Sequence, residues 1–423
     1  MDTPAVPRVR NAALAFIFIT VLLDILAFGM IIPVLPHLIA SFYGGDVSKA
    51  AVMHGIFASV FMVMQFVCSP VQGALSDRFG RRPVILLSNL GLGLDFILMA
   101  VAQTLPLLFI GRVLSGITSA SFSTANAYIA DVTPPEKRGA AFGKLGMAFG
   151  IGFVIAPAIG GWLGEVSPRA PFWVAAALSL ANFCYGLFVL PESLPADRRA
   201  PFSWKRANPV ASLSFLSHHP EVFALAGVLF LISMAHMVYP STFVLYADYR
   251  FHWGSQMVGV TLAIVGILSA VLQGGLVGRA IKAWGERRTL LTGLAFGAIG
   301  FVLYGLAPTG YWFWAAMPVT SLWGLAMPAA QGLMTRQVLP TEQGRLQGAV
   351  GSLSSLAGII GPLLFTRVFA DVTGKDLHTG WAGVTFFLAA AMLLGAWFLA
   401  WRGTAATRAA RAAAAATQDV APE

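Results

Sequence analysis

The chain has 423 residues, of which 57% are hydrophobic and only 11% are charged, and its mean hydropathy is +0.76. A soluble domain carries about 25% charged residues and could not bury this much apolar surface in one or two cores. The composition therefore excludes a cytosolic enzyme, a secreted module and a disordered protein. The net charge of +9 comes from basic residues in short segments between apolar runs, so it does not indicate a nucleic-acid partner. The two cysteines predict neither a disulfide framework nor a metal site.

Apolar runs of about 20 residues, the length that a membrane helix needs, recur along the chain. Barrel strands would be only ~10 residues long and would alternate in polarity. The first run carries Asp24, Pro33 and Pro36 and is too long for a cleaved signal peptide. The sequence predicts an all-α membrane protein with twelve transmembrane helices, at 12–39, 52–75, 84–103, 106–128, 141–164, 171–190, 222–246, 256–280, 289–307, 312–335, 347–369 and 381–401.

The basic residues predict the orientation, because cytoplasmic loops of membrane proteins are enriched in Lys and Arg. Of the 27 Lys and Arg, 21 fall at the two termini and in the even-numbered loops. Five fall in or beside the odd-numbered loops, and Arg112 lies inside a span. We therefore expect both termini in the cytoplasm and the chain in the inner membrane.

Three charged side chains lie well inside the predicted spans, namely Asp24 in the first, Asp95 in the third and Arg112 in the fourth. An Asp at the bilayer centre costs ~2.5–3.5 kcal/mol on insertion scales, so such residues face the protein interior or water. A buried carboxylate whose pKa depends on its surroundings can bind a proton in one conformation and release it in another. Fixed structural hydrogen bonds or a static ion pair are the alternative explanation.

The turn at 73–83 reads GALSDRFGRRP. Gly73 and Gly80 flank the turn, and Gly80 permits its tight geometry. Asp77 can cap a neighbouring helix N-terminus or pair with Arg81, forming a charge latch that breaks when the two halves of the chain move. Arg78 and Arg82 are also explained by anchoring at the cytoplasmic surface. The corresponding turn of the second half carries Lys282 where Asp77 would be, so we expect the latch only in the first half.

Uncharged polar residues within spans are candidates for lining a substrate cavity. These are Gln65, Asn126, Gln273 and His236, although a packing role is an open alternative for His236. Aromatic residues such as Tyr239 and Trp323 could stack on a planar substrate, but most of the 50 aromatics must serve the lipid interface and the core.

A proline-rich, basic segment at 191–221 divides the spans into two sets of six. Gly73, Gly80 and Pro157 recur 205 residues later as Gly278, Gly285 and Pro362. Such parallel six-helix repeats are typical of one large class of secondary transporters, in which the substrate site lies between the halves. We therefore expect a six-helix bundle at 1–190, a cytoplasmic linker at 191–221, a second bundle at 222–401 and a frayed or disordered tail at 402–423. In helices 5 and 11, Gly152, Pro157, Gly361 and Pro362 are expected to allow close packing and bending.

These motifs resemble those of the major facilitator superfamily. The turn at 73–83 is similar to its loop signature, and Gly111-Arg112-Val-Leu-Ser-Gly116 resembles its second signature. The glycines and Ala156-Pro157 of helix 5 resemble the signature of the antiporter branch. Asp24 with the downstream Gly29, Pro33 and Pro36 resembles drug/proton antiporters, and within that branch the tetracycline/proton antiporter family is the nearest match.

The resemblance implies an alternating-access exporter of an amphipathic drug in exchange for protons. It also implies that Arg112 partners Asp24. Tetracycline exporters of this family typically carry a His in helix 8 and an Asp in helix 9, where this chain has Ser269 and Gly297. The proton-coupling carboxylate is therefore expected in the first half, with Asp24 first and Asp95 second.

Other functions remain open at this point. A proton-coupled or passive transporter of another small solute would need more polar cavity groups than these spans offer. A membrane sensor would need a signalling domain, and an enzyme or ATP-driven pump would need a nucleophile pair, a metal cluster or a P-loop, none of which the sequence contains. We expect no enzyme activity, no cofactor, no nucleic-acid partner and no obligate protein partner. The expected partners are the drug, protons and the lipid bilayer, and a divalent cation would accompany the drug if it is a tetracycline.

Overall fold

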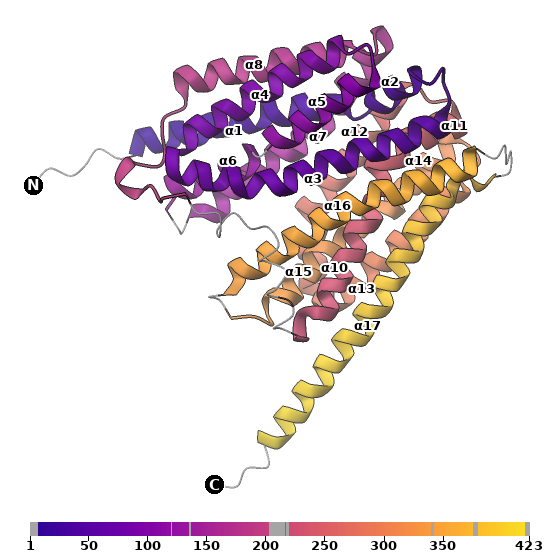
Figure 1. Ribbon diagram of the computed structural model, residues 1–423. Coiled ribbons are helices and arrows are strands. Elements are labelled where there is room, and N and C mark those ends of the chain that lie inside the picture. Colours follow the sequence, from indigo (N-terminus) through magenta and orange to yellow (C-terminus); the bar gives the residue numbers. More distant parts are fainter. Residues whose placement is uncertain are drawn as a thin grey trace, which may run out of the picture. The chain divides into compact units, whose positions relative to one another are not determined.

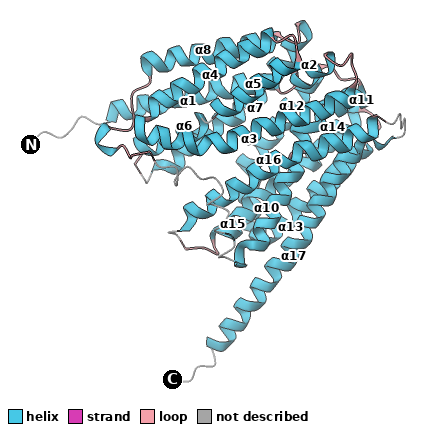
Figure 2. Cartoon of the chain, in the orientation of Figure 1, coloured by secondary structure: helices cyan, strands magenta, loops and turns pink. Residues whose placement is uncertain are grey.

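The computed structural model describes residues 7–119, 121–134, 137–202, 216, 220–339, 342–374 and 380–418. Over these residues the chain forms helices joined by loops and turns, and no strand occurs among them (Figure 2). The predicted all-α fold is therefore confirmed. Between their ends, helices satisfy their backbone hydrogen bonds internally, which a chain in lipid requires because no water is present there.

The first half begins with helices that closely follow the apolar runs (Figure 1). The first apolar run is divided because Pro33 and Pro36 follow Ile31, where α1 ends, and Pro36 occupies the first turn of α2. In chain order the helices are α1 (Pro7–Ile31), α2 (Leu35–Ser41), α3 (Val47–Phe79), α4 (Arg81–Val101), α5 (Leu105–Thr118), α6 (Ser121–Val132), α7 (Arg138–Val166), α8 (Ala170–Val189) and the 3₁₀ turn η2 (Ala196–Arg198).

The second half contains several irregular turns between α-helices. Two are π-helical, η3 (Tyr239–Phe243) and η4 (Leu272–Leu276), and two are 3₁₀ turns, η5 (Leu322–Leu325) and η7 (Gly380–Gly383). The α-helices are α10 (Pro220–His236), α11 (Val244–Phe251), α12 (Ser255–Val271), α13 (Val277–Leu306), α14 (Gly310–Ser321), α15 (Ala326–Thr335), α16 (Gln343–Thr373) and α17 (Val384–Gln418). Such irregularities leave backbone groups outside the regular ladder and are frequent at functional sites.

Within the described residues, nine helical segments are long and apolar enough to cross a membrane. One of them, Ser255–Leu306, contains predicted spans 8 and 9, which are separated at Gly285 by a non-helical backbone with φ 77° and ψ 162°. Predicted span 4 is divided between α5 and α6, and span 10 is divided by η5. Each predicted span thus lies on helix, and the number of membrane crossings stays a prediction.

The described residues form two compact units. One contains those within Met1–Pro209 and Phe243–Ile267, and the other contains those within Val210–Thr242 and Leu268–Glu423. Most of the predicted linker, at 203–215 and 217–219, lies outside the described residues. The predicted tail begins inside α17, which continues as helix to Gln418.

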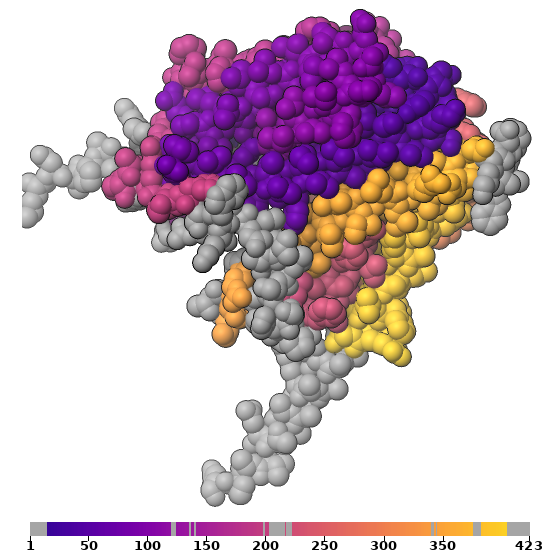
Figure 3. Space-filling model, in the orientation of Figure 1, coloured from indigo at the N-terminus to yellow at the C-terminus, as the bar shows by residue number. Residues whose placement is uncertain are grey.

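In the first unit, α1 packs against α6, α7 and α8, while α4 packs against α5, α6 and α8. Buried apolar side chains of α1, α6 and α7 form a core cluster that includes Val21, Tyr128 and Leu145. The space-filling view shows the side chains of this unit, in indigo to magenta, packed closely over the face in view (Figure 3). Large apolar side chains such as Phe188 and Leu87 are exposed, as expected for helices that face lipid.

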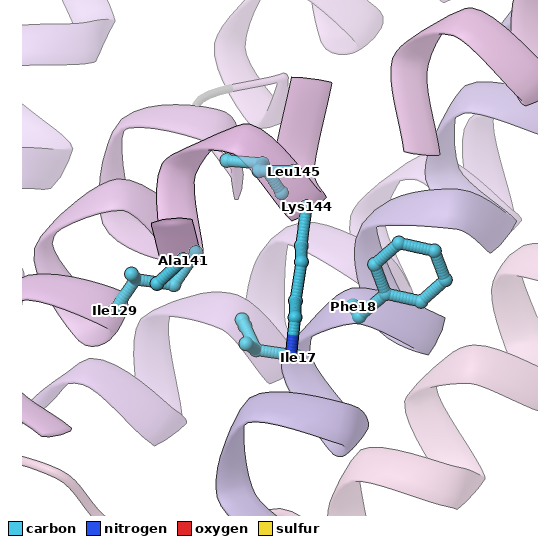
Figure 4. A pocket seen from close by; sticks show the side chains of 6 residues that line it. All are labelled: Ile17, Phe18, Ile129, Ala141, Lys144 and Leu145. Carbon is cyan, nitrogen blue, oxygen red and sulfur yellow. The ribbon is translucent and has the colours of Figure 1, made fainter. Parts of the chain in front are cut away.

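A small pocket lies beside this core cluster, between α1, α6 and α7 (Figure 4). Its lining is apolar except for Lys144, whose side chain extends toward Ile17. None of the predicted site residues lines this pocket. We therefore assign it no part in the candidate site, which consists of buried polar side chains and ion pairs.

In the second unit, α13 packs against α14, α15 and α17, and α10 packs against α15, α16 and α17. Buried aromatic rings fill the interior of this unit. Tyr304 stacks on Phe313 with ring centroids 4.0 Å apart, and Phe301 contacts the Trp323 ring edge-to-face at 5.3 Å. The same cluster includes Phe386 of α17.

Candidate functional site

The turn between α3 and α4 is a single residue, Gly80, with φ 104° and ψ 161°. Side chains disfavour this positive φ, so glycine is required here. The N–H of Gly80 donates to the Ser76 carbonyl oxygen at 3.1 Å, and α4 begins at the next residue. Two long helices thus meet with no intervening loop, which brings Asp77 and Arg81 together.

Arg81 joins three parts of the first unit through its guanidinium group. It donates to Asp77 Oδ1 at 2.6 Å, to Ser76 Oγ at 2.6 Å and to Asp131 Oδ2 at 3.0 Å. The arginine is only 9% exposed. The predicted pair of Asp77 and Arg81 is therefore present, and its extension to Asp131 at the end of α6 was not foreseen. This network ties the turn after α3 to the fourth span.

Glu192, which lies 111 residues after Arg81 in the sequence, caps the first turn of α4. Its carboxylate accepts from the backbone N–H of Arg81 at 2.8 Å and of Arg82 at 3.3 Å. Helix α4 has no capping side chain of its own, because the preceding residue is Gly80. A side chain at Gly80 would overlap Glu192, so the glycine also makes room for the cap. A carboxylate at a helix N-terminus is stabilised by unsatisfied N–H groups and by the helix dipole.

Arg78 and Gly73, the other two residues predicted for this turn, take no part in the network around Arg81. The Arg78 side chain is exposed, and its guanidinium carbon lies 5.0 Å from the centroid of the Phe79 ring. A Cβ atom at Gly73 would meet no atom within 4 Å, so the structure gives no steric reason for glycine there.

The second half has an ion pair of its own beside the equivalent turn, and whether a gating latch is confined to the first half stays a prediction. In the second half, Arg336 Nη2 lies 2.9 Å from Glu286 Oε1, next to the turn at Gly285. Lys282 occupies the position equivalent to Asp77, but the acidic partner is Glu286, at the position equivalent to Arg81.

Asp24 lies on α1 and is 6% exposed. Asn182 of α8 donates through Nδ2 to Asp24 Oδ1 at 2.9 Å and to the Thr20 carbonyl oxygen at 2.9 Å. Asn182 is completely buried. The second contact fixes the amide, so its N–H group is held toward the carboxylate. Asn182 was not predicted, because an amide in an apolar span has no pattern that assigns it a partner.

Asp95 on α4 is 1% exposed and faces α5. Ser115 Oγ donates to Asp95 Oδ2. Oδ1 is buried and has no hydrogen-bond partner among the described residues. A Cβ atom at Gly111 would lie 2.9 Å from Oδ1, so glycine there leaves space for the carboxylate. One oxygen of a buried carboxyl group is thus hydrogen-bonded, and the other is not.

Arg112 follows Gly111 on α5, the glycine whose Cβ position lies 2.9 Å from Asp95 Oδ1. Its guanidinium carbon lies 4.5 Å from the centroid of the Phe61 ring of α3, and the residue is 6% exposed. The partnership of Arg112 with Asp24 that the resemblance implies stays a prediction. Asp95, Ser115 and Arg112 thus form a buried polar group that spans α4 and α5.

The four predicted cavity residues are divided between the two units, with Gln65 and Asn126 in the first and His236 and Gln273 in the second. Gln65 is half-buried and the other three are exposed. His236 lies midway along the apolar segment Val222–Phe251. An accessible polar side chain at that depth suits a water-filled space better than lipid.

His236 belongs to an aromatic group with Tyr239 and Trp323. Its ring centroid is 6.0 Å from that of Tyr239 and 5.8 Å from that of Trp323. Trp323 Nε1 is buried and has no hydrogen-bond partner among the residues that the structure describes. A Cβ atom at Gly297 would lie 2.8 Å from Trp323 Cγ, so the indole ring fills the space beside that glycine. Gly297, the position at which the resemblance implies an Asp, is thus covered by an aromatic ring.

The predicted packing glycines lie at close helix contacts. A side chain at Gly152 of α7 would overlap Ile25 of α1, and one at Gly361 of α16 would approach Met237 to 2.5 Å. Pro157 and Pro362 lie inside α7 and α16. Within the first unit, a Cβ atom at Gly259 of α12 would overlap the Pro157 carbonyl oxygen, so only glycine allows this close approach. Small residues at such contacts let helix backbones approach closely.

Comparison with known proteins identifies the family. The family model described as Major Facilitator Superfamily matches residues 17–362 and 251–422. The tetracycline resistance protein of class C from Escherichia coli is 39% identical over 384 residues, which cover 91% of this chain and 95% of that protein. The class B protein from Escherichia coli is 34% identical and covers 89% of this chain and 94% of that protein.

Solved structures show the same fold. The human organic anion transporter MFSD10 (TETRAN) has a TM-score of 0.68 at 24% identity and covers 94% of this chain and 100% of its own. The nucleoside transporter NupG has a TM-score of 0.75 at 15% identity, with 93% and 99% covered. The chain belongs to the major facilitator superfamily and, within it, to the family of the tetracycline resistance exporters, and it is an integral membrane transporter rather than an enzyme.

Proposed function

We propose that this transporter exports an amphipathic, tetracycline-like drug from the cytoplasm in exchange for protons, by alternating access. Its full-length similarity to tetracycline resistance proteins supports the class of substrate. The single observation that carries proton coupling is the buried group of Asp95, Ser115 and Arg112. It buries a carboxyl group, one oxygen of which has no hydrogen-bond partner among the described residues, against the helix that carries Ser115 and the permanent positive charge of Arg112.

A carboxyl group in this setting can alternate between two protonation states. When Asp95 is ionised, Arg112 and Ser115 stabilise its charge; when it is protonated, Arg112 retains the Phe61 ring as a partner. A shift of Arg112 or of α5 between conformations would therefore change the proton affinity of Asp95. A proton gradient supplies about 1.4 kcal/mol per pH unit and about 2.3 kcal/mol per 100 mV. One proton per drug is thus sufficient for moderate accumulation.

Asp24 is the second carboxyl group of this mechanism. Asn182 donates to it, and an amide N–H group stabilises an ionised carboxylate more than a protonated one. Movement of α8 relative to α1 would remove this donor. We infer that Asp24 responds to substrate binding and that Asp95 carries the proton.

The aromatic group of His236, Tyr239 and Trp323 is the proposed contact for the planar part of the drug. Rings of this kind stack on flat ligands, and the imidazole, phenol and indole groups supply polar atoms at their edges. Gln273, exposed on η4, adds an amide donor and acceptor in the same unit. A tetracycline would carry its own divalent cation as part of the substrate, and the transporter itself would need no cofactor.

The basic residues support insertion in the inner membrane with both termini in the cytoplasm. A reporter fused after α8 should therefore read as cytoplasmic. The proposal requires the lipid bilayer, protons and a small-molecule drug as partners, and it requires neither nucleic acid nor a second protein.

Proteoliposomes test the proposal directly. The wild-type protein should accumulate tetracycline when a pH gradient is imposed, and Asp95→Asn should lose this accumulation while keeping drug counterflow. Counterflow needs binding and conformational exchange but no net proton release. Asp371→Asn is the matched control, because that carboxylate is an exposed member of an ion pair on α16. Wild-type protein that moves no tetracycline would refute the drug assignment, and full accumulation by Asp95→Asn would refute the proton assignment.

A further inference from the structure

Part of the second sequence repeat lies in the first compact unit. Helix α11 and the beginning of α12 belong to the predicted second bundle, yet Phe243–Ile267 groups with the first unit. There α11 lies against α2 and α3 (Figure 1). The residues that meet lie in or beside the predicted odd-numbered loops 40–51, 165–170 and 247–255, which the basic residues assign to the periplasmic side. This part of the unit therefore contains contacts between the two repeats at their predicted periplasmic end.

Glycines of α7 make this contact close. A Cβ atom at Gly164 would lie 3.0 Å from Ser255 Cβ of α12, and one at Gly161 would overlap the Ser255 carbonyl oxygen. Glu165 Oε1 accepts from the backbone N–H of Gln256 at 3.1 Å, in the first turn of α12. Backbones of the two repeats are thus in direct contact here, and a transporter that works by alternating access must separate them in part of its cycle.

His37 of α2 contacts both helices of the second repeat. Its Nε2 atom lies 3.9 Å from Asp248 Oδ2 on α11, and its Nδ1 atom lies 3.2 Å from Ser255 Oγ on α12. The side chains of His37 and Asp248 are 21% and 36% exposed, so the pair is partly shielded from solvent. His37 was not predicted, because a histidine at the end of an apolar run has no pattern that assigns it a partner.

The backbone determines which ring nitrogen of His37 carries the hydrogen. Nδ1 lies 3.0 Å from the Pro33 carbonyl oxygen, and a carbonyl oxygen can only accept a hydrogen bond. The neutral ring therefore carries its hydrogen on Nδ1, and the Ser255 hydroxyl can accept from the same N–H group. Nε2 is buried, keeps its lone pair and has no hydrogen-bond partner in the part of the chain that the structure describes. A second proton thus binds at Nε2, the atom that faces the Asp248 carboxylate.

Protonation of His37 would change the interaction with Asp248 from repulsion to attraction. The neutral ring presents a lone pair to the carboxylate, whereas the imidazolium presents an N–H group and a positive charge. Histidine is the side chain that ordinarily changes its charge in the physiological pH range.

The neighbouring charged groups leave this pair distinct. Lys49 Nζ lies 3.0 Å from Asp46 Oδ2, and Glu165 caps α12. Arg250 is exposed and keeps its charge at every relevant pH. Asp248 is therefore the carboxylate that faces Nε2. The titratable or charged side chains at this end of α3, α7 and α11, apart from Asp248, are Asp46, Lys49, His54, Glu165, Tyr246, Tyr249 and Arg250.

We infer that His37 is a proton-binding site at which a periplasmic proton holds the contact of α2 and α7 with α11 and α12 closed. The inference rests on the proposed alternating access and orientation, but not on the identity of the drug. In an exchange of drug for protons, a proton enters while the periplasmic side is open, and that side must then close. An ion pair that exists only with protonated His37 shifts the population toward the closed conformation. The site therefore favours the step that follows proton uptake.

A buried cysteine at this contact reports opening without a drug. Val34 is completely buried, and its Cγ2 atom and Ser255 both border the Cβ position of Gly164. In a background with Cys68→Ser and Cys184→Ser, Val34→Cys should react with an impermeant maleimide in intact cells only when α12 moves away. Each variant is compared with this parent at the same pH, so the pH dependence of thiol reactivity cancels.

His37→Asn is the test variant, because an amide N–H group can still donate to the Pro33 carbonyl oxygen while Nε2 is lost. At about pH 5.5, where histidine is charged, His37→Asn should label about two- to fivefold faster than the parent, the range expected of a partly exposed ion pair. At about pH 8, where histidine is neutral, the two rates should agree. Asp248→Asn should give the same result, and the double variant should label no faster than either single variant.

His252→Asn is the matched control. This histidine is exposed at the same end, four residues after Asp248, and its φ of 53° is one that asparagine also adopts. It should label as the parent does at both pH values. In proteoliposomes, His37→Asn should need a more acidic lumen than the wild type to reach the same rate of drug uptake, while drug counterflow and the apparent unfolding temperature stay unchanged.

The outcomes separate this site from the proposed function. If the wild-type protein moves no tetracycline but His37→Asn and Asp248→Asn label faster at acidic pH, the drug assignment fails and the His37 site stands. Parental labelling of both variants at acidic pH would overturn the site. Additive effects of the two substitutions, or an equal effect of His252→Asn, would also overturn it, because the response would then not come from attraction between His37 and Asp248. Should His37→Asn fail to fold, Asp248→Asn alone decides by the same comparison.

Discussion

The guanidinium group of Arg112 rests on the face of the Phe61 ring, with its central carbon 4.5 Å from the ring centroid. A positive charge that cannot be removed by deprotonation is thus placed against an aromatic face inside a membrane protein. A cation over a ring gains about 0.5–2 kcal/mol, most when water is excluded. The ring therefore provides Arg112 with a partner that does not depend on the protonation state of Asp95.

This relationship predicts that two conservative substitutions slow export less than removal of the charge does. Arg112→Lys keeps the charge near Asp95 but loses the planar stacking group, because an ammonium is compact and strongly hydrated. Phe61→Leu keeps the packing volume but removes the ring. Both should slow pH-driven export about tenfold or less, as expected for a loss of ~1 kcal/mol, whereas Arg112→Gln should abolish it. Equal loss of export in Arg112→Lys and Arg112→Gln would show that the stacked geometry matters more than the charge.

Asn182 should affect coupling through Asp24. Asn182→Leu removes the donor to Asp24 Oδ1 while keeping a similar volume. A hydrogen bond to a charged group contributes about 1.5–3 kcal/mol, so pH-driven accumulation should fall by at least tenfold. Counterflow in the same proteoliposomes should change little. Parallel loss of counterflow would mean that Asn182 holds the fold of α1 and α8 instead of positioning the carboxylate.

Gly80→Ala and Gly73→Ala form a matched pair within one turn. At Gly80 the substitution combines a strained positive φ with overlap on Glu192, which would displace the cap of α4. Strain of this kind costs about 1–3 kcal/mol. We expect a lower apparent unfolding temperature and slower export for Gly80→Ala, measured on purified protein and in vesicles. Gly73→Ala should behave as wild type, and a defect there would indicate a contact made only in another conformation.

The parts of the site that could be predicted are those with a local pattern. Asp77 and Arg81 are four residues apart at a helix junction, and length and polarity alone indicate most membrane helices. Glu192 and Asp131 could not be predicted as partners of this turn, because they come from segments 111 and 50 residues away. The ion pair of Glu286 and Arg336 was not predicted, because the position equivalent to Asp77 carries Lys282 and the acidic residue stands instead at the position equivalent to Arg81.

Gly160→Ala should disturb the contact between α7 and α1, with Gly150→Ala as its control. A side chain at Gly160 would overlap the Met30 carbonyl group, which is backbone and cannot rotate away, whereas one at Gly150 would meet nothing within 4 Å. Overpacking costs about 1–3 kcal/mol, and alanine is favoured over glycine in a helix by ~1 kcal/mol. Gly160→Ala should therefore lower the apparent unfolding temperature and slow export, and Gly150→Ala should leave both equal or slightly improved. Equal behaviour of the two variants would show that α1 and α7 can separate at no cost, and that close packing at Gly160 has no part in the transport cycle.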